Sequence, residues 1–106
     1  MNQNERNKYL ASPQHGSGWV PIITQLDRDL AQLDPEYNIL QIKEKFGGLR
    51  YYFATETEFG PTMDALVRWA ELFSVFTCEE CGGNSDVTTS GSGWIKTLCN
   101  SCRIES

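Results

Sequence analysis

The sequence has little of what most enzymes and membrane proteins depend on. It has a single histidine, His15, among 106 residues, so catalytic triads and most general-base schemes lack their usual base. It contains no glycine-rich phosphate loop and no serine nucleophile elbow. No apolar run approaches the roughly 20 residues that span a bilayer, and the N-terminus is polar, unlike a signal peptide. We therefore expect a cytoplasmic protein that is not an enzyme and has no membrane partner.

Positive charge is also in short supply. The chain has 9 lysines and arginines against 14 aspartates and glutamates, which gives a formal net charge of -5. Non-specific binding to a nucleic-acid backbone is therefore not favoured, although a local basic face could still bind one. Net charge points to proteins as partners, and it also permits an acidic surface that imitates nucleic acid.

The N-terminal part of the chain divides into a leader and a helix. Residues 1 to 18 contain few core-forming residues and predict a flexible leader. From Trp19 onward, apolar residues recur at helical spacing with polar residues between them. Pro21 fits the first turn of this helix, and Asp34 with Pro35 ends it.

Two segments rich in β-forming residues follow, at residues 38 to 46 and 49 to 54. Gly47 and Gly48 separate them, and such a loop supplies the positive φ values that a tight hairpin needs. Alternation then assigns six side chains to the buried face: Leu40, Ile42, Phe46, Leu49, Tyr51 and Phe53. The opposite face collects Lys43, Lys45, Arg50 and Tyr52, beside Gln41.

That opposite face is the first candidate binding surface. Its basic residues form a positive patch on a negative chain, suited to a phosphate, a nucleic-acid strand or an acidic protein surface. A solvated face whose lysines protect an edge strand is the alternative interpretation. A homodimer is also compatible with the sequence, because an exposed hairpin edge can pair with its copy.

A second helix is predicted over residues 61 to 76, with Pro61 in its first turn. Its expected buried stripe consists of Leu66, Trp69, Ala70 and Phe73. Two helices packed on a hairpin make an α+β body, which we assign to residues 19 to 77.

The four cysteines Cys78, Cys81, Cys99 and Cys102 form two Cys-x-x-Cys pairs separated by 17 residues. This is the spacing of a two-pair zinc site, because two residues between ligands let a turn aim both sulfurs at one ion. Four thiolates leave no position for water, so the predicted Zn²⁺ is structural. Residues 78 to 106 therefore predict a zinc ribbon or a treble-clef-like element, and the short chain after Cys102 favours the ribbon.

Between the cysteine pairs, residues 86 to 98 predict two short strands joined by a turn that includes Ser90, Gly91, Ser92 and Gly93. Trp94 lies on this small hairpin, where there is little core for it to enter. We therefore add Trp94 to the candidate partner-binding residues, which are Lys43, Lys45, Arg50, Tyr52 and Trp94.

The alternative chemistries have less support. Disulfides need an oxidising compartment that nothing indicates, and a redox Cys-x-x-Cys pair needs a βαβ context that is missing. Asp34, Gln41 and Lys43 resemble the acidic and lysine residues of metal-dependent nucleases, but they are too close in sequence for the usual intervening structure.

Several segments resemble one group of proteins. They are GWVPII at residues 18 to 23, QIKEKFGGLRYY at 41 to 52, CEECG at 78 to 82 and GWIKTLC at 93 to 99. These are similar to small uncharacterised proteins from bacteriophages and bacterial genomes. The resemblance implies a phage or prophage setting, in which small proteins often bind and block host machinery, including defence systems. It implies no activity.

The sequence thus predicts an α+β protein, in which a helix, a β-hairpin and a second helix are followed by a four-cysteine zinc element. A protein-interaction module is the favoured function. A nucleic-acid-binding accessory protein that uses the basic hairpin face is the second hypothesis.

Overall fold

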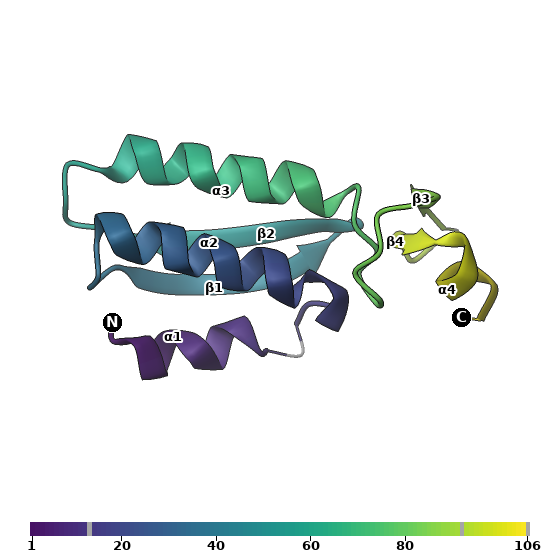
Figure 1. The fold of residues 1–106 in the computed structure, drawn as a ribbon, viewed down its shortest axis with the longest axis horizontal. Coiled ribbons are helices and arrows are strands. Elements are labelled where there is room, and N and C mark those ends of the chain that lie inside the picture. Colours follow the sequence, from purple (N-terminus) through teal and green to yellow (C-terminus); the bar gives the residue numbers. More distant parts are fainter. Residues whose placement is uncertain (13, 92, 106) are drawn as a thin grey trace.

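The computed structural model describes residues 1 to 12, 14 to 91 and 93 to 105. An α+β body is followed by a small C-terminal element at one end of the molecule (Figure 1). In chain order the body contains α1 (Gln3–Leu10), η1 (Ser17–Trp19), α2 (Val20–Leu33), β1 (Asn38–Lys45), β2 (Gly48–Ala54) and α3 (Gly60–Ser74). The C-terminal element contains β3 (Val87–Ser90), β4 (Lys96–Cys99) and α4 (Asn100–Glu105). The predicted α+β class is confirmed.

The helix α2 covers the inner face of the hairpin formed by β1 and β2 (Figure 1). It has one apolar face, from which Ile23, Leu26 and Leu30 enter the core. Pro21 lies in its first turn and Asp34 caps its end, as the sequence predicts. A helix with one apolar face can be oriented in only one way, which is why α2 was predictable in detail.

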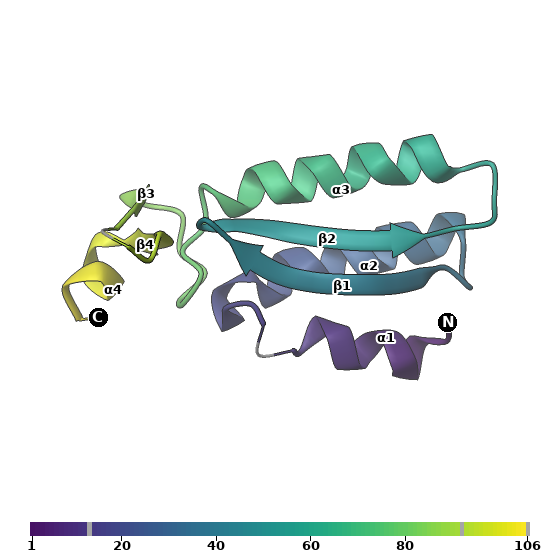
Figure 2. The ribbon, with the colours of Figure 1, turned by 180° about the vertical axis from the view of Figure 1, so that it is seen from behind.

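The helix α3 runs along β2, and α1 lies beside β1, while none of the helices in the described part of the chain lies over the outer face of the hairpin (Figure 2). Side chains of α3 satisfy backbone donors of β2: Leu49 N–H donates to Ser74 Oγ at 3.0 Å, and Tyr51 N–H donates to Glu71 Oε2 at 3.0 Å. At Leu49 and Tyr51 the backbone donors on the outer edge of β2 are therefore already hydrogen-bonded to α3. They are not available to pair with the hairpin of a second copy.

The hairpin differs from its prediction at the turn and at a bulge. The two-residue loop consists of Phe46 and Gly47, with φ values of 55° and 80°, and Gly48 pairs with Lys45 as the first residue of β2. The pairing register also shifts at Leu40, so this residue is 59 % exposed.

Two of the six assignments to the buried face of the hairpin, Leu40 and Phe46, are consequently wrong. The extra residue at the bulge turns Leu40 outward and places Ile39 in the core, because a one-residue slip reverses the face. Phe46 leaves the core because it belongs to the turn rather than to the strand, and it is 69 % exposed. The remaining assignments, Ile42, Leu49, Tyr51 and Phe53, are buried or half-buried.

The orientation of α3 also differs from its prediction. Met63, Val67, Ala70 and Ser74 face the core, whereas Trp69 and Phe73 are 59 % and 54 % exposed. The small Ala70 and Ser74 let the helix approach β2 closely enough for the Ser74 hydroxyl to reach a strand backbone. Of the predicted stripe, Ala70 is buried and Leu66 half-buried, whereas Trp69 and Phe73 were placed wrongly. The helix is apolar around most of its circumference, so its sequence does not fix which side is buried.

Residues 3 to 10 form the helix α1 rather than part of a flexible leader. This helix is polar, but its Arg6 is buried and donates from Nε to Asp27 Oδ1 at 2.8 Å. Tyr37 Oη donates to the same oxygen at 2.5 Å, and Gln3 Nε2 donates to Asp27 Oδ2 at 2.8 Å. A buried ion pair therefore fastens α1 to α2, a mode of attachment that composition does not show.

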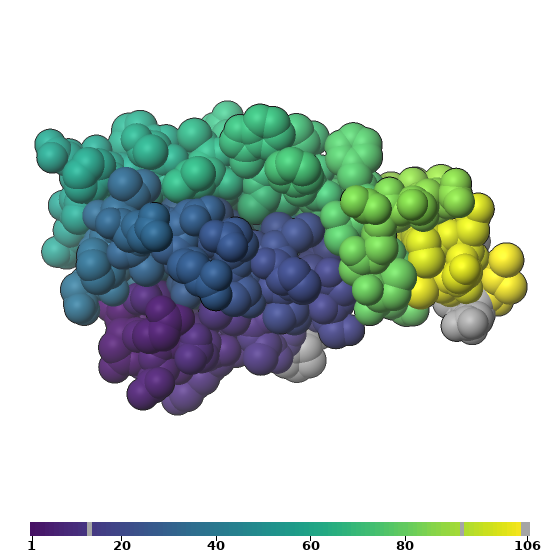
Figure 3. Space-filling model, viewed as in Figure 1, coloured from purple at the N-terminus to yellow at the C-terminus, as the bar shows by residue number. Residues whose placement is uncertain are grey.

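The C-terminal element consists of a cysteine turn, the hairpin β3–β4 and the short helix α4 (Figure 1). In the space-filling view its residues, coloured light green to yellow, form a lobe at one end of the α+β body (Figure 3). The two short strands are confirmed. Because Cys102 lies within α4, the arrangement is the treble-clef-like alternative rather than the favoured ribbon. The leader's Pro13, the turn's Ser92 and the final Ser106 lie outside the described residues.

Candidate metal centre

Four cysteines from separate parts of the C-terminal element meet at one point. Cys78 and Cys81 lie in the turn that follows α3, Cys99 ends β4 and Cys102 lies in α4. Their sulfur atoms all lie within 4.8 Å of one another, and none is in a disulfide. The pairs that the sequence separates by 17 residues are therefore adjacent in space.

The first cysteine turn is held by its own backbone. Cys78 N–H donates to Gly83 O at 2.8 Å, and Gly82 N–H donates to Cys78 O at 2.9 Å. Backbone N–H groups also reach the sulfurs: Gly83 N–H donates to Cys81 Sγ at 3.4 Å and Cys102 N–H to Cys99 Sγ at 3.5 Å. Such hydrogen bonds stabilise thiolate rather than thiol, because the acceptor is negatively charged.

Without a bound cation, the electrostatics of the cluster favour the ionisation of one cysteine and disfavour the ionisation of its neighbours. Burial alone raises the pKa of Cys78, but hydrogen bonds from the backbone of Cys81, Cys99 and Glu80 outweigh it and lower this pKa to about 6. The neighbouring sulfurs act in the opposite direction on Cys102, whose pKa Cys99 and then Cys78 raise above its ordinary value. Four thiolates at this spacing therefore need a positive ion among them.

The distance between two of the sulfur atoms matches the distance expected around a tetrahedral metal ion. Thiolates held at about 2.3 Å from a tetrahedral ion lie roughly 3.8 Å from one another. Cys81 Sγ and Cys99 Sγ are 3.7 Å apart. Four sulfur donors also complete a tetrahedron, which leaves no coordination position for a substrate or a reactive water.

The metal centre is attached directly to the α+β body. The hydroxyl of Thr97, on β4, donates to Gly47 O in the tip of the first hairpin, and Thr97 N–H donates to Glu79 Oε2 at 3.0 Å. Gly18 N–H donates to Glu79 O at 2.9 Å, and a Cβ on Gly18 would lie only 2.2 Å from Cys78 O. The position of the cysteine turn thus fixes β4 against the hairpin tip.

This attachment creates a mixed aromatic surface, which we call the tip surface: Lys45, Phe46, Trp94 and Ile95. Phe46 and Trp94 line the same shallow hollow of 210 Å³, together with Glu44, Gly93 and Ile95. Trp94 is 72 % exposed, and the Lys45 ammonium lies 5.7 Å from the centroid of the Phe46 ring. Two distant segments of the sequence, one of them held by the cysteines, therefore each contribute an exposed aromatic residue to one hollow.

The other predicted binding residues lie on the open outer face of the first hairpin. Lys43 pairs directly with Arg50, and Tyr52 pairs with Gln41, so these side chains share one face by register. Lys43 and Arg50 are half-buried and Tyr52 is exposed. The structure thus places Lys43, Arg50 and Tyr52 together, and places Lys45 and Trp94 at the adjoining tip.

Sequence reasoning missed two surface features. It placed Phe46 in the core, and it placed the exposed aromatic residues Trp69 and Phe73 there too. A signal for the first was available, since Phe46 precedes Gly47 and a two-residue turn could begin at either position.

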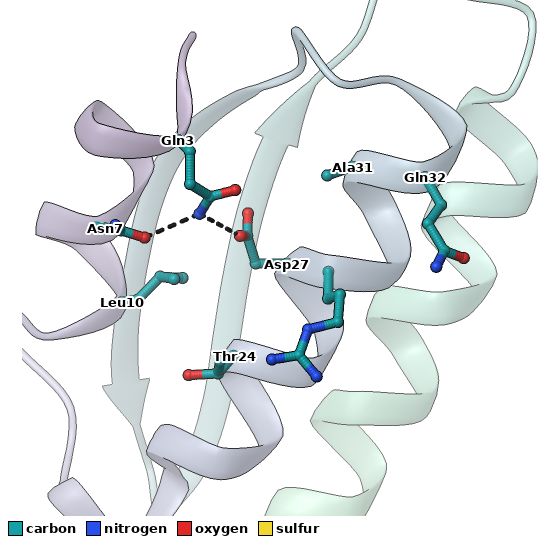
Figure 4. Close-up of a pocket in the computed structure, with 8 residues that line it drawn as sticks. Gln3, Asn7, Leu10, Thr24, Asp27, Ala31 and Gln32 are labelled. Carbon is teal, nitrogen blue, oxygen red and sulfur yellow. Dashed lines mark hydrogen bonds between the residues drawn. The ribbon is translucent and has the colours of Figure 1, made fainter.

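Asp34, the carboxylate considered for nuclease-like chemistry, has structural partners, and so does the buried Asp27. A polar hollow between α1 and α2 contains Asp27, which Gln3 contacts from α1 (Figure 4). Asp34 accepts hydrogen bonds from Glu36 N–H at 3.0 Å and from Thr55 Oγ1 at 2.6 Å. Both aspartates thus act in holding loops and helices in place.

No family model matches the chain, and no curated protein sequence or solved structure shows significant similarity to it. Within the described ranges, no helix combines the length and the apolar character that crossing a membrane requires.

Proposed function

We propose that this protein is a non-enzymatic protein-binding module whose four cysteines hold one structural Zn²⁺. Zinc is the ion whose coordination preference matches a closed set of four thiolates. In this proposal the metal holds the C-terminal element in the fold that sets Trp94 beside Phe46. The partner binds the tip surface, with Lys43, Arg50 and Tyr52 as a basic flank.

The observation that carries this proposal is the conformation of Phe46. A non-glycine residue with a φ of 55° at a hairpin turn is strained by about 1–3 kcal/mol, and glycine or asparagine is the usual choice there. The chain instead uses a large aromatic residue and leaves it 69 % exposed. Exposed aromatic rings beside basic groups are typical of the residues that dominate protein interfaces.

Phe46→Gly should therefore raise stability while it weakens binding. We expect the free energy of unfolding to rise by about 1 kcal/mol, because glycine adopts the left-handed conformation without strain. Urea denaturation of the zinc-loaded protein measures this change. Phe46→Val keeps the strain, so its stability should not rise. A loss of stability in Phe46→Gly would show that the ring supports the fold rather than a binding surface.

The binding itself is tested by capture of a partner from host lysate, with nuclease treatment, on the immobilised zinc-loaded protein. Trp94→Ala should weaken the captured interaction by about 2 kcal/mol, or roughly 30-fold in Kd, as for a central interface residue. Trp69→Ala is the matched control, since it removes an exposed tryptophan from a different surface. Equal losses in the two variants, or no nuclease-resistant partner, would contradict the proposal.

We extend the proposal to a setting in the cytoplasm of a bacterium. The resemblance of residues 18 to 23 and 41 to 52 to phage and bacterial proteins supports a host protein as the partner. Host defence factors are the first class to examine among captured proteins. The acidic net charge of -5 is compatible with this, since charge does not draw the chain to nucleic acid.

A second candidate function is nucleic-acid binding by the outer hairpin face. Its support is the direct cross-strand pairing of Lys43 with Arg50 next to the exposed Tyr52. In this case a fluorescent single strand should bind with an affinity that falls as salt rises, by about 0.7 log units per tenfold salt for each phosphate contacted. Lys43→Ala and Arg50→Ala should weaken binding and flatten this slope, whereas Lys8→Ala, at an exposed position of α1, should not.

A further inference from the structure

A groove of 440 Å³ lies between α2 and α3, and it shares no residue with the tip surface. Its apolar lining includes Ile22 and Leu26 from α2 and Leu66 from α3. Trp69 and Phe73 form an aromatic wall, in which the two rings stack with their centroids 5.4 Å apart. A concave, mainly apolar surface of this size is typical of small-molecule sites, which enclose about 300–1,000 Å³.

Among the residues described, Asp29 is the only charged residue that lines this groove. It is half-buried, and its Oδ1 accepts a hydrogen bond from Gln25 Nε2 at 3.0 Å. In the described part of the chain no lysine or arginine forms an ion pair with it. Partial burial removes hydration from a carboxylate, and a nearby cation offsets that cost. The groove therefore has a place for a positive group that comes from outside the chain.

The carboxylate lies at one end of the groove. The helices α2 and α3 run in opposite directions (Figure 1), so Asp29 and Leu66 lie at one end and Pro21 and Thr77 at the other. Along α2 the lining runs from Pro21 to Asp29, which corresponds to about 12 Å at the rise of an α-helix. The negative charge thus ends an apolar stretch and does not interrupt it.

We propose that the groove binds a small amphiphilic cation, in which an apolar chain or ring system ends in an ammonium or guanidinium group. The positive group pairs with Asp29, and the apolar part lies along Trp69 and Phe73 toward Ile22. Aromatic ring faces suit both parts, because they attract cations and pack against apolar groups.

The limits of the apolar stretch favour a small molecule over a segment of a protein. Asp29 bounds the stretch at one end and Thr77 bounds it at the other. A docked protein helix would carry its apolar face past both of these polar residues, whereas a single small ligand ends within them. This site is additional to the proposed function, since it requires neither the metal nor the tip surface.

Three probes that share an octyl chain test the proposal on the zinc-loaded full chain: octyltrimethylammonium, octyl glucoside and octyl sulfonate. Each is added below its micelle-forming concentration, and amide and indole resonances in NMR spectra report where it binds. The cation should bind saturably and shift the resonances of Leu66, Trp69 and Phe73. Its Kd should lie about tenfold below that of octyl sulfonate, with the uncharged probe between them, because the probes differ in their interaction with one nearby carboxylate.

Substitutions at Asp29 should change the order of the probes. Asp29→Asn should bring the three Kd values within about threefold of one another, and Asp29→Lys should make octyl sulfonate the tightest ligand. Trp69→Ala should weaken all three by about fivefold, because it removes half of the aromatic wall. Asp64→Asn is the matched control: it removes one negative charge from an exposed position of α3 outside the groove, so the Kd of the cation should stay within about twofold.

Equal affinities of the three probes for the unmodified chain overturn the proposal. Shifts that do not saturate, or that lie away from the groove, overturn it as well. Equal losses in Asp29→Asn and Asp64→Asn would show that net charge, and not the groove, selects the cation. None of these measurements involves Trp94 or a protein partner, so this proposal and the proposed function fail separately.

Discussion

Cys78→Ser is expected to release the metal and unfold the C-terminal element while the α+β body remains folded. Binding of zinc to small four-ligand elements supplies on the order of 10 kcal/mol, far more than β3, β4 and α4 can gain from their own packing. Leu98 and Cys78 are the buried apolar side chains of this element among the residues described. The body, in contrast, has its own core around Trp19, Ile23 and Leu49.

The expected result has three measurable parts. Metal analysis should find one zinc per wild-type chain and none retained in Cys78→Ser. Amide resonances of residues 78 to 105 should collapse toward unfolded positions, those of Phe46 and Gly47 should shift because the Thr97 contact is lost, and those of α2 should stay. Ser101→Ala, between two ligands but exposed, is the matched control and should keep its zinc. Full zinc retention in Cys78→Ser would contradict the account, and so would global unfolding.

Arg6→Met is expected to lower the free energy of unfolding by about 3–5 kcal/mol, because it leaves the buried carboxylate of Asp27 without its cation. Tyr37 cannot replace the cation, because its neutral hydroxyl donates a hydrogen bond to Asp27 but carries no positive charge. Burial, followed by the proximity of Tyr51 and Asp27, raises the pKa of Tyr37 well above its usual range, so its hydroxyl stays protonated and keeps its hydrogen bond to Asp27. Urea denaturation of the zinc-loaded protein measures the loss.

Lys8→Met is the matched control for Arg6→Met. It removes a positive charge from the same helix at an exposed position, so a change within about 0.5 kcal/mol is expected. Replacing both members of the pair, in Arg6→Met with Asp27→Leu, should restore much of the stability because no buried charge remains. Equal effects of Arg6→Met and Lys8→Met would show that α1 is held by something other than the ion pair.

The sequence predicted best the features that depend on residues close together in the chain. The spacing of the four cysteines identified the cluster, because the two short loops within the pairs fix the local geometry. The single apolar face of α2 and the prolines at the starts of α2 and α3 also depend on neighbouring residues only. These features hold irrespective of how the rest of the chain packs.

The errors occurred where two local solutions were equally good. The sequence pattern fits a two-residue turn at Phe46 and Gly47 as well as one at Gly47 and Gly48. In β1, the bulge at Leu40 determines that Ile39 rather than Leu40 faces the core. The contact of Gly47 O with Thr97, 50 residues away, is among the interactions that select the observed turn. The helix α3 is apolar around most of its circumference. Its contact with the backbone of β2 favours the face that carries small side chains, because the Ser74 hydroxyl can then reach Leu49 N–H.

The helix α1 was missed because hydrophobic periodicity cannot detect a helix that docks through charge. Its attachment depends on the pairing of Arg6 with a residue 21 positions further along the chain. One local signal was present, since Asn2 caps the helix by accepting a hydrogen bond from Glu5 N–H at 2.9 Å. A capping pattern near a chain terminus should therefore count as evidence for a helix even without an apolar face.

The central claim is that the metal holds Trp94 in place for a partner, and zinc-dependent binding tests it most directly. The captured partner should bind the zinc-loaded chain, dissociate when a chelator removes the metal, and bind again when zinc is restored. The α+β body should keep its helical spectrum throughout. Binding that persists in the metal-free chain would contradict the claim, because the tip surface would then form without the site that is proposed to hold it.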